Sequence, residues 1–518
     1  MLVHDYLEYW ARVTPSTACI EDDDGVWTYA EVNARSDRVA EALASLGLVP
    51  GDRLAVLSEN RVEYLPLYFG AFKAGVVPVP LNYRLHPREW VHIVNDAGAR
   101  AVIAESRYTA ALDSVRPGLD GVGRFVALGE SGRGWLAFDQ VVGSATGETT
   151  DHRVDETADL YQMYTSGTTG RPKGAVLTHR AVDSNIRQTQ IVLGLRPGSR
   201  ALIVMPLYHA GAAVQCFSVV ASGGTILLRP GFDAADCVQT MDERGVATAT
   251  FVPAMIQAML VGVPEVGDRA FLSLERIAYG ASPIAEETLR QAIQVFGCDF
   301  VQATGMTECS SVVTLLGPDD HRLALAGRPE LLLSCGRPAV GTRVRVVDDL
   351  DRDTGPGEKG EILVSGPQTM RGYWNMPDAT ADALRDGWMH TGDAGHLDED
   401  GYLYVSDRVK DMIVSGGENV YPREVEDVLF RMPEIADAAV IGVPDERWGE
   451  TVKAVVVVRP GLSVTESAVI AWCRDRLAGF KCPRSVDLVD ELPRNPSGKV
   501  LKRVLREPHW VNEARSVG

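Results

Sequence analysis

Residues 164–174 read Tyr-Thr-Ser-Gly-Thr-Thr-Gly-Arg-Pro-Lys-Gly and follow directly on an apolar stretch. Glycine lets the backbone fold so that several N–H groups face one anion, and the Ser and Thr hydroxyls add further donors. Lys173 brings positive charge to the same segment. The stretch therefore predicts a loop that holds a polyphosphate through Thr165, Ser166, Gly167, Thr168, Thr169, Gly170 and Lys173.

This loop differs from the Walker A phosphate loop. That motif places Gly-Lys directly before Ser or Thr, whereas Lys173 follows Pro172 and precedes Gly174. The alternative interpretation is a flexible surface linker rich in Gly and Thr. The cations and the many hydroxyls within one short segment favour the phosphate loop over the linker.

On both sides of the loop, helix signals alternate with short apolar runs. Thr28 and Glu31 form a capping box that predicts a helix start, and Gly47 is a predicted helix stop. Buried strands are predicted at residues 54–57, 76–80, 101–104, 201–205, 225–228 and 247–252. Such alternation predicts an α/β fold, with parallel sheets that carry helices on both faces.

Beyond residue 336 the pattern changes to short strands between Gly and Pro turns, which predict a β-rich subdomain. After residue 411, helices and strands are predicted within about 110 residues, enough for a separate α+β core. We therefore predict a large N-terminal domain at residues 1–409, with two helix-flanked, mainly parallel sheets and the β-rich subdomain. A small α+β domain is predicted at residues 410–518.

Four further segments carry polar groups suited to a nucleotide. Glu308 ends the string Gln-Ala-Thr-Gly-Met-Thr-Glu and could hold Mg²⁺, which prefers carboxylate and phosphate oxygens. Asp393 ends His-Thr-Gly-Asp, a turn suited to ribose hydroxyls. Residues 404–419 place charges at the domain boundary before a Gly-Gly loop, and Lys499 lies on a turn rich in Pro and Gly. Taken singly, each has a structural alternative, such as a helix cap or a solvated lysine.

The composition narrows the classes of function. Of the 518 residues, 45% are hydrophobic and 23% charged, as in ordinary globular proteins. The formal net charge of −19 comes with no Lys/Arg block, so a nucleic-acid partner is not expected. Without a signal peptide or an apolar run of spanning length, we expect a cytoplasmic location and no integral membrane contact. The eight cysteines include no CxxC pair, which disfavours a structural metal site.

Taken together, these segments resemble the acyl-adenylate-forming superfamily, which includes acyl-CoA synthetases, aryl-CoA ligases, luciferases and the adenylation domains of peptide synthetases. The resemblance extends from Thr28 to Lys502, with the motifs in the family's order. It implies an ATP-dependent acid–thiol ligase. A carboxylate would attack the α-phosphorus of ATP, and the resulting acyl-adenylate would react with a thiol. ATP, Mg²⁺ and coenzyme A are the implied cofactors and co-substrates.

The resemblance also implies residue roles in the first step. Thr165 and Glu308 match the Mg²⁺ positions, and Lys499 matches the catalytic lysine. Further nucleotide contacts would fall on Gly280, Ala281, Ser282, Gln302, Ala303, Thr304, Thr307, Asp393 and Arg408. Thr304 departs from the family, which commonly has a Tyr there that stacks on adenine. Loss of such stacking costs about 1 kcal/mol, so nucleotide affinity is expected to be weaker or compensated elsewhere.

For the second step, the resemblance implies that the C-terminal domain is mobile and rotates about a hinge at Lys410. A lysine needed in one step only, as Lys499 would be, fits a domain that moves between the steps. After the rotation, coenzyme A would lie along Ser415, Gly416, Gly417 and Glu418.

Pro206-Leu-Tyr-His209 resembles the acyl-CoA and aryl-CoA branch, in which the histidine lies beside the substrate carboxylate and counts as catalytic. No acid occurs between Met205 and Phe217, which disfavours an amino acid substrate. The expected pocket consists of His209, Ala210, Gly211, Val214, Phe251, Val252, Gly280, Met306 and Ser311. These mainly small, apolar residues predict a medium- or long-chain fatty acid and a role in lipid metabolism. An aryl or alicyclic acid, and acyl transfer to a carrier protein, stay open as alternatives.

Two other classes of function are alternatives to the ligase. A luciferase-like oxygenase would use the same adenylate, but no feature of the chain favours light-producing oxidation. A nucleotide-binding protein without activity is disfavoured because Lys499 and Glu308 are both present. The partners are therefore expected to be small molecules, while the oligomeric state, a homodimer included, stays open.

Overall fold

The computed structural model describes residues 1–23, 25–147, 154–165, 172–280, 284–408, 411–415, 418–445, 448–494 and 500–510. The chain forms two compact units. The first is Met1–Val344 with Val364–Met389, and the second is Arg345–Leu363 with His390–Gly518. The predicted boundary at Lys410, which lies outside the described residues, stays a prediction.

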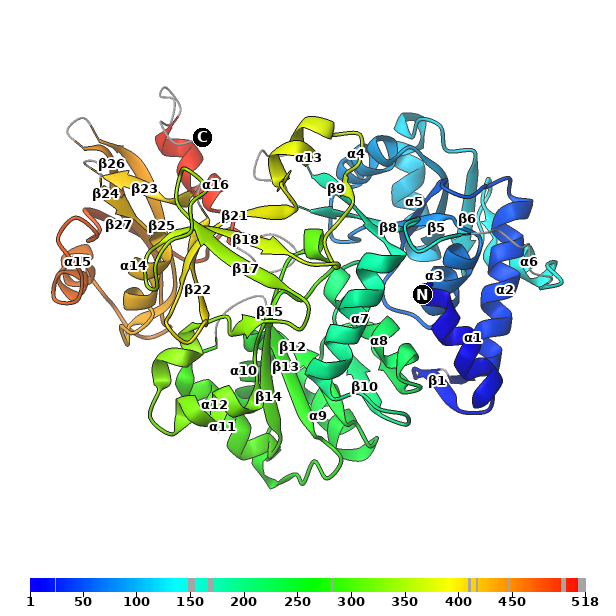
Figure 1. The fold of residues 1–518 in the computed structure, drawn as a ribbon, viewed down its shortest axis with the longest axis horizontal. Helices are drawn as coiled ribbons and strands as arrows, with labels where there is room; N and C mark the ends of the chain where they lie inside the picture. Colours follow the sequence, from blue (N-terminus) through cyan, green and yellow to red (C-terminus); the bar gives the residue numbers. More distant parts are fainter. Residues whose placement is uncertain are drawn as a thin grey trace. The chain divides into compact units, whose positions relative to one another are not determined.

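Two large, mainly parallel sheets form the centre of the first unit (Figure 1). One has nine strands, in the order β16 (Arg337–Pro338), β15 (Thr314–Leu316), β14 (Asp299–Thr304), β13 (Arg276–Gly280), β12 (Thr248–Phe251), β10 (Arg200–Ile203), β11 (Thr225–Leu228), β1 (Ala18–Glu21) and β2 (Val26–Thr28). The other has five parallel strands, in the order β4 (Val77–Pro80), β3 (Arg53–Leu57), β5 (Ala99–Glu105), β6 (Arg124–Leu128) and β7 (Leu136–Ala137). The predicted α/β fold is confirmed.

Helices flank these sheets, and Figure 1 shows α7 and α8 side by side against the nine-stranded sheet. The helices of the unit are α1 (Val3–Val13), α2 (Tyr29–Ser45), α3 (Tyr64–Lys73), α4 (Pro87–Ala97), α5 (Ser106–Val115), α6 (Phe138–Gly143), α7 (His179–Leu193), α8 (Ala210–Ala221), α9 (Ala234–Glu243), α10 (Pro253–Gly262), α11 (Glu286–Phe296), α12 (Pro318–Leu325) and α13 (Pro377–Ala383). The capping box is confirmed, because Thr28 Oγ1 accepts the Glu31 N–H and Glu31 accepts the Thr28 N–H. Gly47, at φ +88°, follows the end of α2 as predicted.

A third, antiparallel sheet of the first unit carries the two ends of the predicted phosphate loop. Its order is β19 (Gly372–Tyr373), β9 (Lys173–Thr178) and β8 (Asp159–Thr165). The predicted β-rich stretch forms a five-stranded sheet from β17 (Arg343–Val347), β18 (Gly360–Ser365), β20 (Leu384–Arg385), β21 (Trp388–Leu397) and β22 (Leu403–Arg408).

Most of the second unit is a five-stranded sheet with its own apolar core. The strand order is β24 (Glu418–Val420), β23 (Ile413–Ser415), β26 (Gly449–Val458) and β25 (Ile435–Asp445), with β27 (Ser485–Val489) beside β26. Its helices are α14 (Pro422–Leu429), α15 (Glu466–Arg474) and α16 (Lys502–Arg506). Val425, Val440 and Val456 are fully buried in the core of this sheet and its helices. The predicted α+β character of this region is confirmed.

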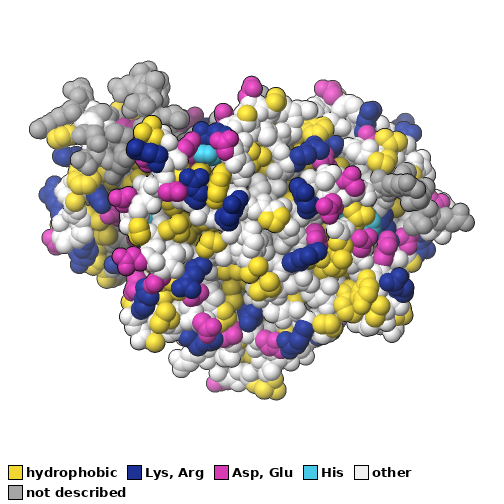
Figure 2. Space-filling view, in the orientation of Figure 1, with side chains coloured by type: hydrophobic (Ala, Val, Ile, Leu, Met, Phe, Trp, Pro, Cys, Tyr) yellow, Lys and Arg dark blue, Asp and Glu magenta, His cyan; other side chains and the backbone are white. Residues whose placement is uncertain are grey.

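Neither the surface charge on the face shown in Figure 2 nor the described helices have an unusual pattern. On the face shown in Figure 2, Lys and Arg side chains are interspersed with Asp and Glu. Within the described ranges, no helix combines the length and the apolar character that crossing a bilayer requires.

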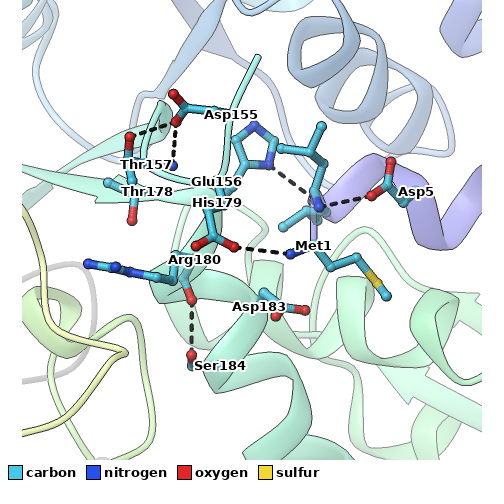
Figure 3. A network of polar contacts seen from close by, with 12 residues as sticks. Met1, Asp5, Asp155, Glu156, Thr157, Thr178, His179, Arg180, Asp183 and Ser184 are labelled. Carbon is cyan, nitrogen blue, oxygen red and sulfur yellow. Dashed lines mark hydrogen bonds and ion pairs between the residues drawn. The ribbon is translucent and has the colours of Figure 1, made fainter. Parts of the chain in front are cut away.

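A polar network fixes the N-terminal helix of the first unit to helix α7 (Figure 3). The Val3 N–H donates to Nδ1 of His179 at 3.1 Å, and the Tyr6 hydroxyl donates to Asp183 at 2.7 Å. The Met1 ammonium lies 3.4 Å from a carboxylate oxygen of Glu156. Burial lowers the pKa of His179 to about 3, with a smaller contribution from the neighbouring His4.

Because this histidine is buried as the neutral form, acid should destabilise the fold. An unfolded histidine titrates near pH 6.5, roughly. Between about pH 3 and pH 6.5 the unfolded chain therefore binds a proton that folded His179 does not. The free energy of unfolding falls by about 1.4 kcal/mol per pH unit as the pH drops through that window, and this histidine has no effect above it.

We expect His179→Gln to reduce this pH dependence, because Gln can accept the Val3 N–H but does not titrate. Urea unfolding at a series of pH values from about 6 to about 4 would give the slope of the free energy of unfolding against pH. This slope should differ between the variant and the wild type by the equivalent of about one proton. His509→Gln, at an exposed position, is the control and should keep the wild-type slope. An unchanged slope in His179→Gln would contradict the assignment.

Candidate active site

The predicted phosphate loop connects the antiparallel strands β8 and β9. Thr165 is the last residue of β8 and pairs with Lys173, the first residue of β9. The hairpin thus brings the two ends of the loop together. Between them, Ser166, Gly167, Thr168, Thr169 and Gly170 lie outside the described residues. Their contact with a polyphosphate therefore stays a prediction.

The packing at the base of the hairpin explains why the motif ends in a glycine, Gly174. A Cβ on Gly174 would lie 2.6 Å from Nε2 of Gln162 and 3.0 Å from Cζ of Tyr164, so a side chain there would displace the Gln162 amide. Gln162 Nε2 donates to the Tyr164 hydroxyl at 3.0 Å, and that hydroxyl donates to Asp96 Oδ2 at 2.5 Å. Since Asp96 lies in α4, the strand that leads into the loop is fixed to this helix.

We expect Tyr164→Phe to weaken ATP binding, because the start of the loop loses its bond to Asp96. A hydrogen bond to a charged group contributes about 1.5–3 kcal/mol. Relaxation of the strand around the new Phe should offset part of this loss, so we expect the KM for ATP to rise about fivefold. Steady-state kinetics against ATP would measure it. Tyr6→Phe removes a similar tyrosine–carboxylate bond in α1 and is the matched control. Equal KM values for the Tyr164 variant and the control would contradict the prediction.

Glu308 lies in the 3₁₀ turn Thr307–Cys309 that follows β14, and it is 7% exposed. Its Oε1 accepts hydrogen bonds from the Thr165 hydroxyl at 3.4 Å and from the Tyr373 hydroxyl at 2.9 Å. The two predicted Mg²⁺ ligands, Thr165 and Glu308, are 143 positions apart in the chain and contact each other directly.

The Thr165 hydroxyl and the Glu308 carboxylate fit as oxygen ligands of an Mg²⁺ ion bound together with ATP. Among the described residues, no group of three or more His, Cys, Asp or Glu side chains could enclose an ion. One carboxylate and one hydroxyl leave most coordination positions to phosphate oxygens and water, as Mg²⁺ commonly requires. Within the residues that the structure describes, no Lys or Arg forms an ion pair with Glu308, so the charge of its carboxylate is available to a cation.

The predicted nucleotide contacts of the first unit lie at the ends of neighbouring strands. Gly280 ends β13 and pairs with Ala303 of β14. A Cβ on Gly280 would lie 2.4 Å from the Ala303 carbonyl oxygen, so a side chain there is excluded. Gln302 is buried, and its Oε1 accepts no hydrogen bond from the described residues. Thr304 ends β14, and Thr307 begins the turn that carries Glu308.

A tight turn after β14 positions Glu308 and part of the predicted acid pocket. A Cβ on Gly305 would lie 1.5 Å from the Ser311 carbonyl oxygen, which only glycine avoids. The Asn185 side chain donates to the Val312 carbonyl at 3.0 Å and accepts the Val312 N–H at 3.1 Å. Helix α7 thus holds the far side of the turn.

His209 directly precedes α8, with the ring of Tyr208 centred 4.4 Å from its own. Burial, with a smaller effect of the positive charge of Arg84, lowers the pKa of His209 to about 4. The imidazole is therefore neutral near pH 7. A neutral imidazole has one N–H donor and can orient a carboxylate without pairing with it as a cation.

The other predicted pocket residues come from α8 and from strand ends. Ala210, Gly211 and Val214 lie in α8, and the Cβ position of Gly211 is 3.4 Å from Ser311 Oγ. The helix therefore packs closely on the turn after β14. Phe251 ends β12, Val252 follows it, and Met306 precedes the 3₁₀ turn. The carboxyl ends of parallel strands are where α/β sheets bind ligands.

In the second unit, the predicted nucleotide contacts Asp393 of β21 and Arg408 of β22 pair in the sheet. Ser415 and Glu418 pair in the hairpin of β23 and β24, at the two ends of the predicted coenzyme A loop. The remaining predicted site residues, Ala281, Ser282, Lys410, Gly416, Gly417 and Lys499, lie outside the described residues.

Sequence reasoning missed Asp96 and Tyr373. Asp96 lies near the end of a helix and Tyr373 in a two-residue strand, and neither belongs to a motif with a recognisable charge or glycine pattern. Their contacts with Tyr164 and Glu308 span 68 and 65 positions, so no local signal could have found them.

The chain matches two family models. Residues 7–374 match the AMP-binding enzyme model, and residues 424–499 match the model of the AMP-binding enzyme C-terminal domain.

Relatives and solved structures agree with these matches. The chain is 39% identical to a fatty acid–[acyl-carrier-protein] ligase, ScoC, of Streptomyces coeruleorubidus, over 98% of this chain and 96% of that protein. It is also 39% identical to a feruloyl-CoA synthase of Amycolatopsis sp, over 96% of both chains. The structure of ATP-bound MatB from Rhodopseudomonas palustris is similar at a TM-score of 0.88 and 31% identity, over 98% of this chain and 99% of that one.

Proposed function

Because the chain belongs to the AMP-binding enzyme family, we propose that it joins a carboxylic acid to a thiol through an acyl-adenylate, with ATP converted to AMP and pyrophosphate. The observation that carries the proposal is the contact of Thr165 with Glu308 at the base of the loop hairpin. A hydroxyl and a buried carboxylate in contact, with Lys173 paired beside Thr165, support the binding of a metal-bound triphosphate at this hairpin.

The first step calls for charge stabilisation and orientation. Negative charge accumulates on the phosphate oxygens as the carboxylate attacks, and preorganised donors and cations lower its energy. Glu308 and Thr165 would hold Mg²⁺, which would neutralise part of that charge. Neutral His209 would hold the acid through its N–H, and Lys173 would face the phosphates from the first residue of β9. Neither step requires a nucleophile from the protein.

For the acid, a medium- or long-chain fatty acid agrees best with the small and apolar pocket residues of α8 and with the fatty acid named for ScoC. An aryl acid is the second candidate, favoured by the feruloyl-CoA synthase relative. Coenzyme A is the proposed acceptor. The acyl carrier protein named for ScoC is the alternative acceptor.

A substrate panel tests these choices. AMP and pyrophosphate release would be followed with ATP, Mg²⁺ and decanoate, palmitate, ferulate or 2-succinylbenzoate, each with coenzyme A or a phosphopantetheinylated carrier protein. The expected result is AMP formation in step with acyl-CoA, with the highest kcat/KM for a fatty acid. A preference for ferulate would support the second candidate, and no AMP with any acid would contradict the proposed function.

A further inference from the structure

Tyr373 contacts two residues that sequence reasoning assigned to the phosphate site, Glu308 and Lys173, although it belongs to none of the motifs. Its hydroxyl donates to Glu308 Oε1 at 2.9 Å, and the same oxygen accepts the Thr165 hydroxyl. The Lys173 ammonium lies over the face of the Tyr373 ring, 4.9 Å from its centre. One side chain thus joins the carboxylate and the ammonium of the site.

The backbone around Tyr373 is held firmly beside the loop hairpin. Strand β19 pairs with β9, where Tyr373 faces Ala175. The Trp374 N–H donates to the Gly174 carbonyl at 2.8 Å, and the Met370 N–H donates to the Glu308 carbonyl at 2.7 Å. The segment is therefore fixed at one end to the hairpin and at the other to the turn of Glu308.

A second contact fixes the residue from the side of α13. The Tyr373 N–H donates to Thr380 Oγ1 at 2.9 Å. A Cβ on Gly372, whose φ is +155°, would lie 2.6 Å from Thr380 Cγ2, so glycine is needed for this close approach. The position of the phenol is thus determined by the backbone as well as by its own hydrogen bond.

We propose that Tyr373 is a positioning residue of the adenylation step, an inference that rests on the proposed function. Its hydroxyl holds Oε1 of Glu308, and none of the described hydrogen bonds reaches Oε2, which is left for a cation. Its ring holds the Lys173 ammonium through a cation–π contact. The residue keeps a metal-binding carboxylate and a phosphate-facing cation at a fixed separation, without touching the reacting atoms.

The two contacts can be removed separately. Tyr373→Phe removes the hydroxyl and keeps the ring, so the Mg²⁺ concentration for half-maximal ATP binding should rise about tenfold, while ATP affinity without metal stays unchanged. Tyr373→Leu also removes the ring face, so it should in addition weaken metal-free ATP binding about threefold. Titration calorimetry with ATP at a series of Mg²⁺ concentrations measures both effects without any turnover.

Half-reactions and a matched control separate positioning from general damage. Pyrophosphate release should fall in Tyr373→Phe, whereas thioester formation from supplied acyl-adenylate should keep the wild-type rate. Tyr6→Phe removes a tyrosine–carboxylate bond of α1 and should change none of these values. Melting temperatures of all variants would show whether folding is preserved.

Three outcomes would test the role of Tyr373 and the proposed function. An unchanged Mg²⁺ dependence in Tyr373→Phe, with folding preserved, would overturn the inference. Equal losses in both half-reactions would also overturn it, because they indicate a structural role only. Absence of AMP formation by the wild type with every acid would refute the proposed function, while the calorimetric comparison of Mg²⁺ and ATP binding would still decide the role of Tyr373.

Discussion

Lys499→Ala should reduce acyl-adenylate formation by about 10²–10³-fold and leave thioester formation from supplied acyl-adenylate close to the wild-type rate. Loss of a single preorganised donor to a developing charge has effects of this size in other enzymes. Pyrophosphate release measures the first step. The second step is measured by mixing the variant with synthetic acyl-adenylate and coenzyme A.

The two half-reactions should respond differently to Lys499→Ala because the charge on the phosphate groups changes differently in the two steps. In the first step, negative charge builds up on the phosphate oxygens, in a protein whose formal net charge is −19. A lysine beside the α-phosphate stabilises that charge. In the second step the adenylate already exists and the leaving AMP carries one phosphate, so the demand for this cation is smaller. A lysine that acts in the first step only is expected if its domain rotates between steps.

The control for this experiment is a lysine of the second unit with a known structural contact. Lys359 lies 3.4 Å from a carboxylate oxygen of Glu424 and over the ring of Tyr421. Lys359→Ala should leave both half-reactions near the wild-type rates. Equal losses of both half-reactions in Lys499→Ala would contradict the assignment of Lys499 to the first step.

Much of the fold could be predicted because its signals are local. The run Leu54–Leu57 is continuous and apolar because β3 is buried on both faces of a parallel sheet, and the structure places it in Arg53–Leu57. The Thr28–Glu31 capping box needs only residues within one helical turn, and both of its bonds are present.

The site could be predicted only in part. Glycine-rich and charged strings marked the ends of the phosphate loop and Glu308, because each carries a composition that few other segments share. His209 was found through the resemblance of its segment to the acyl-CoA and aryl-CoA branch. The bonds Tyr164–Asp96 and Tyr373–Glu308 could not be predicted, because they depend on how strands and helices far apart in the chain pack together. The low pKa of His209 likewise follows from burial, which its neighbours in sequence do not determine.

Glu308→Gln should reduce acyl-adenylate formation about 10²-fold or more and abolish the stabilisation of the protein by Mg²⁺ with ATP. Glutamine keeps the size of the side chain and an oxygen that can accept from Tyr373, but it lacks the charge that binds a cation. Rates of pyrophosphate release and unfolding transitions with and without ligand would measure the two effects. Glu130→Gln, at an exposed position, is the control.

Without ligand, the same variant should be as stable as the wild type or more stable. Glu308 is 7% exposed, and its hydrogen bonds within the described residues come from two hydroxyls rather than from a cation. Burial of a charge without a cationic partner is costly, so its removal relieves the apo protein of that cost. With nucleotide and metal at about 100 times Kd, the wild type gains about 2.7 kcal/mol, and the variant should gain far less. A variant that unfolds more easily without ligand would show that Glu308 serves the fold rather than the metal.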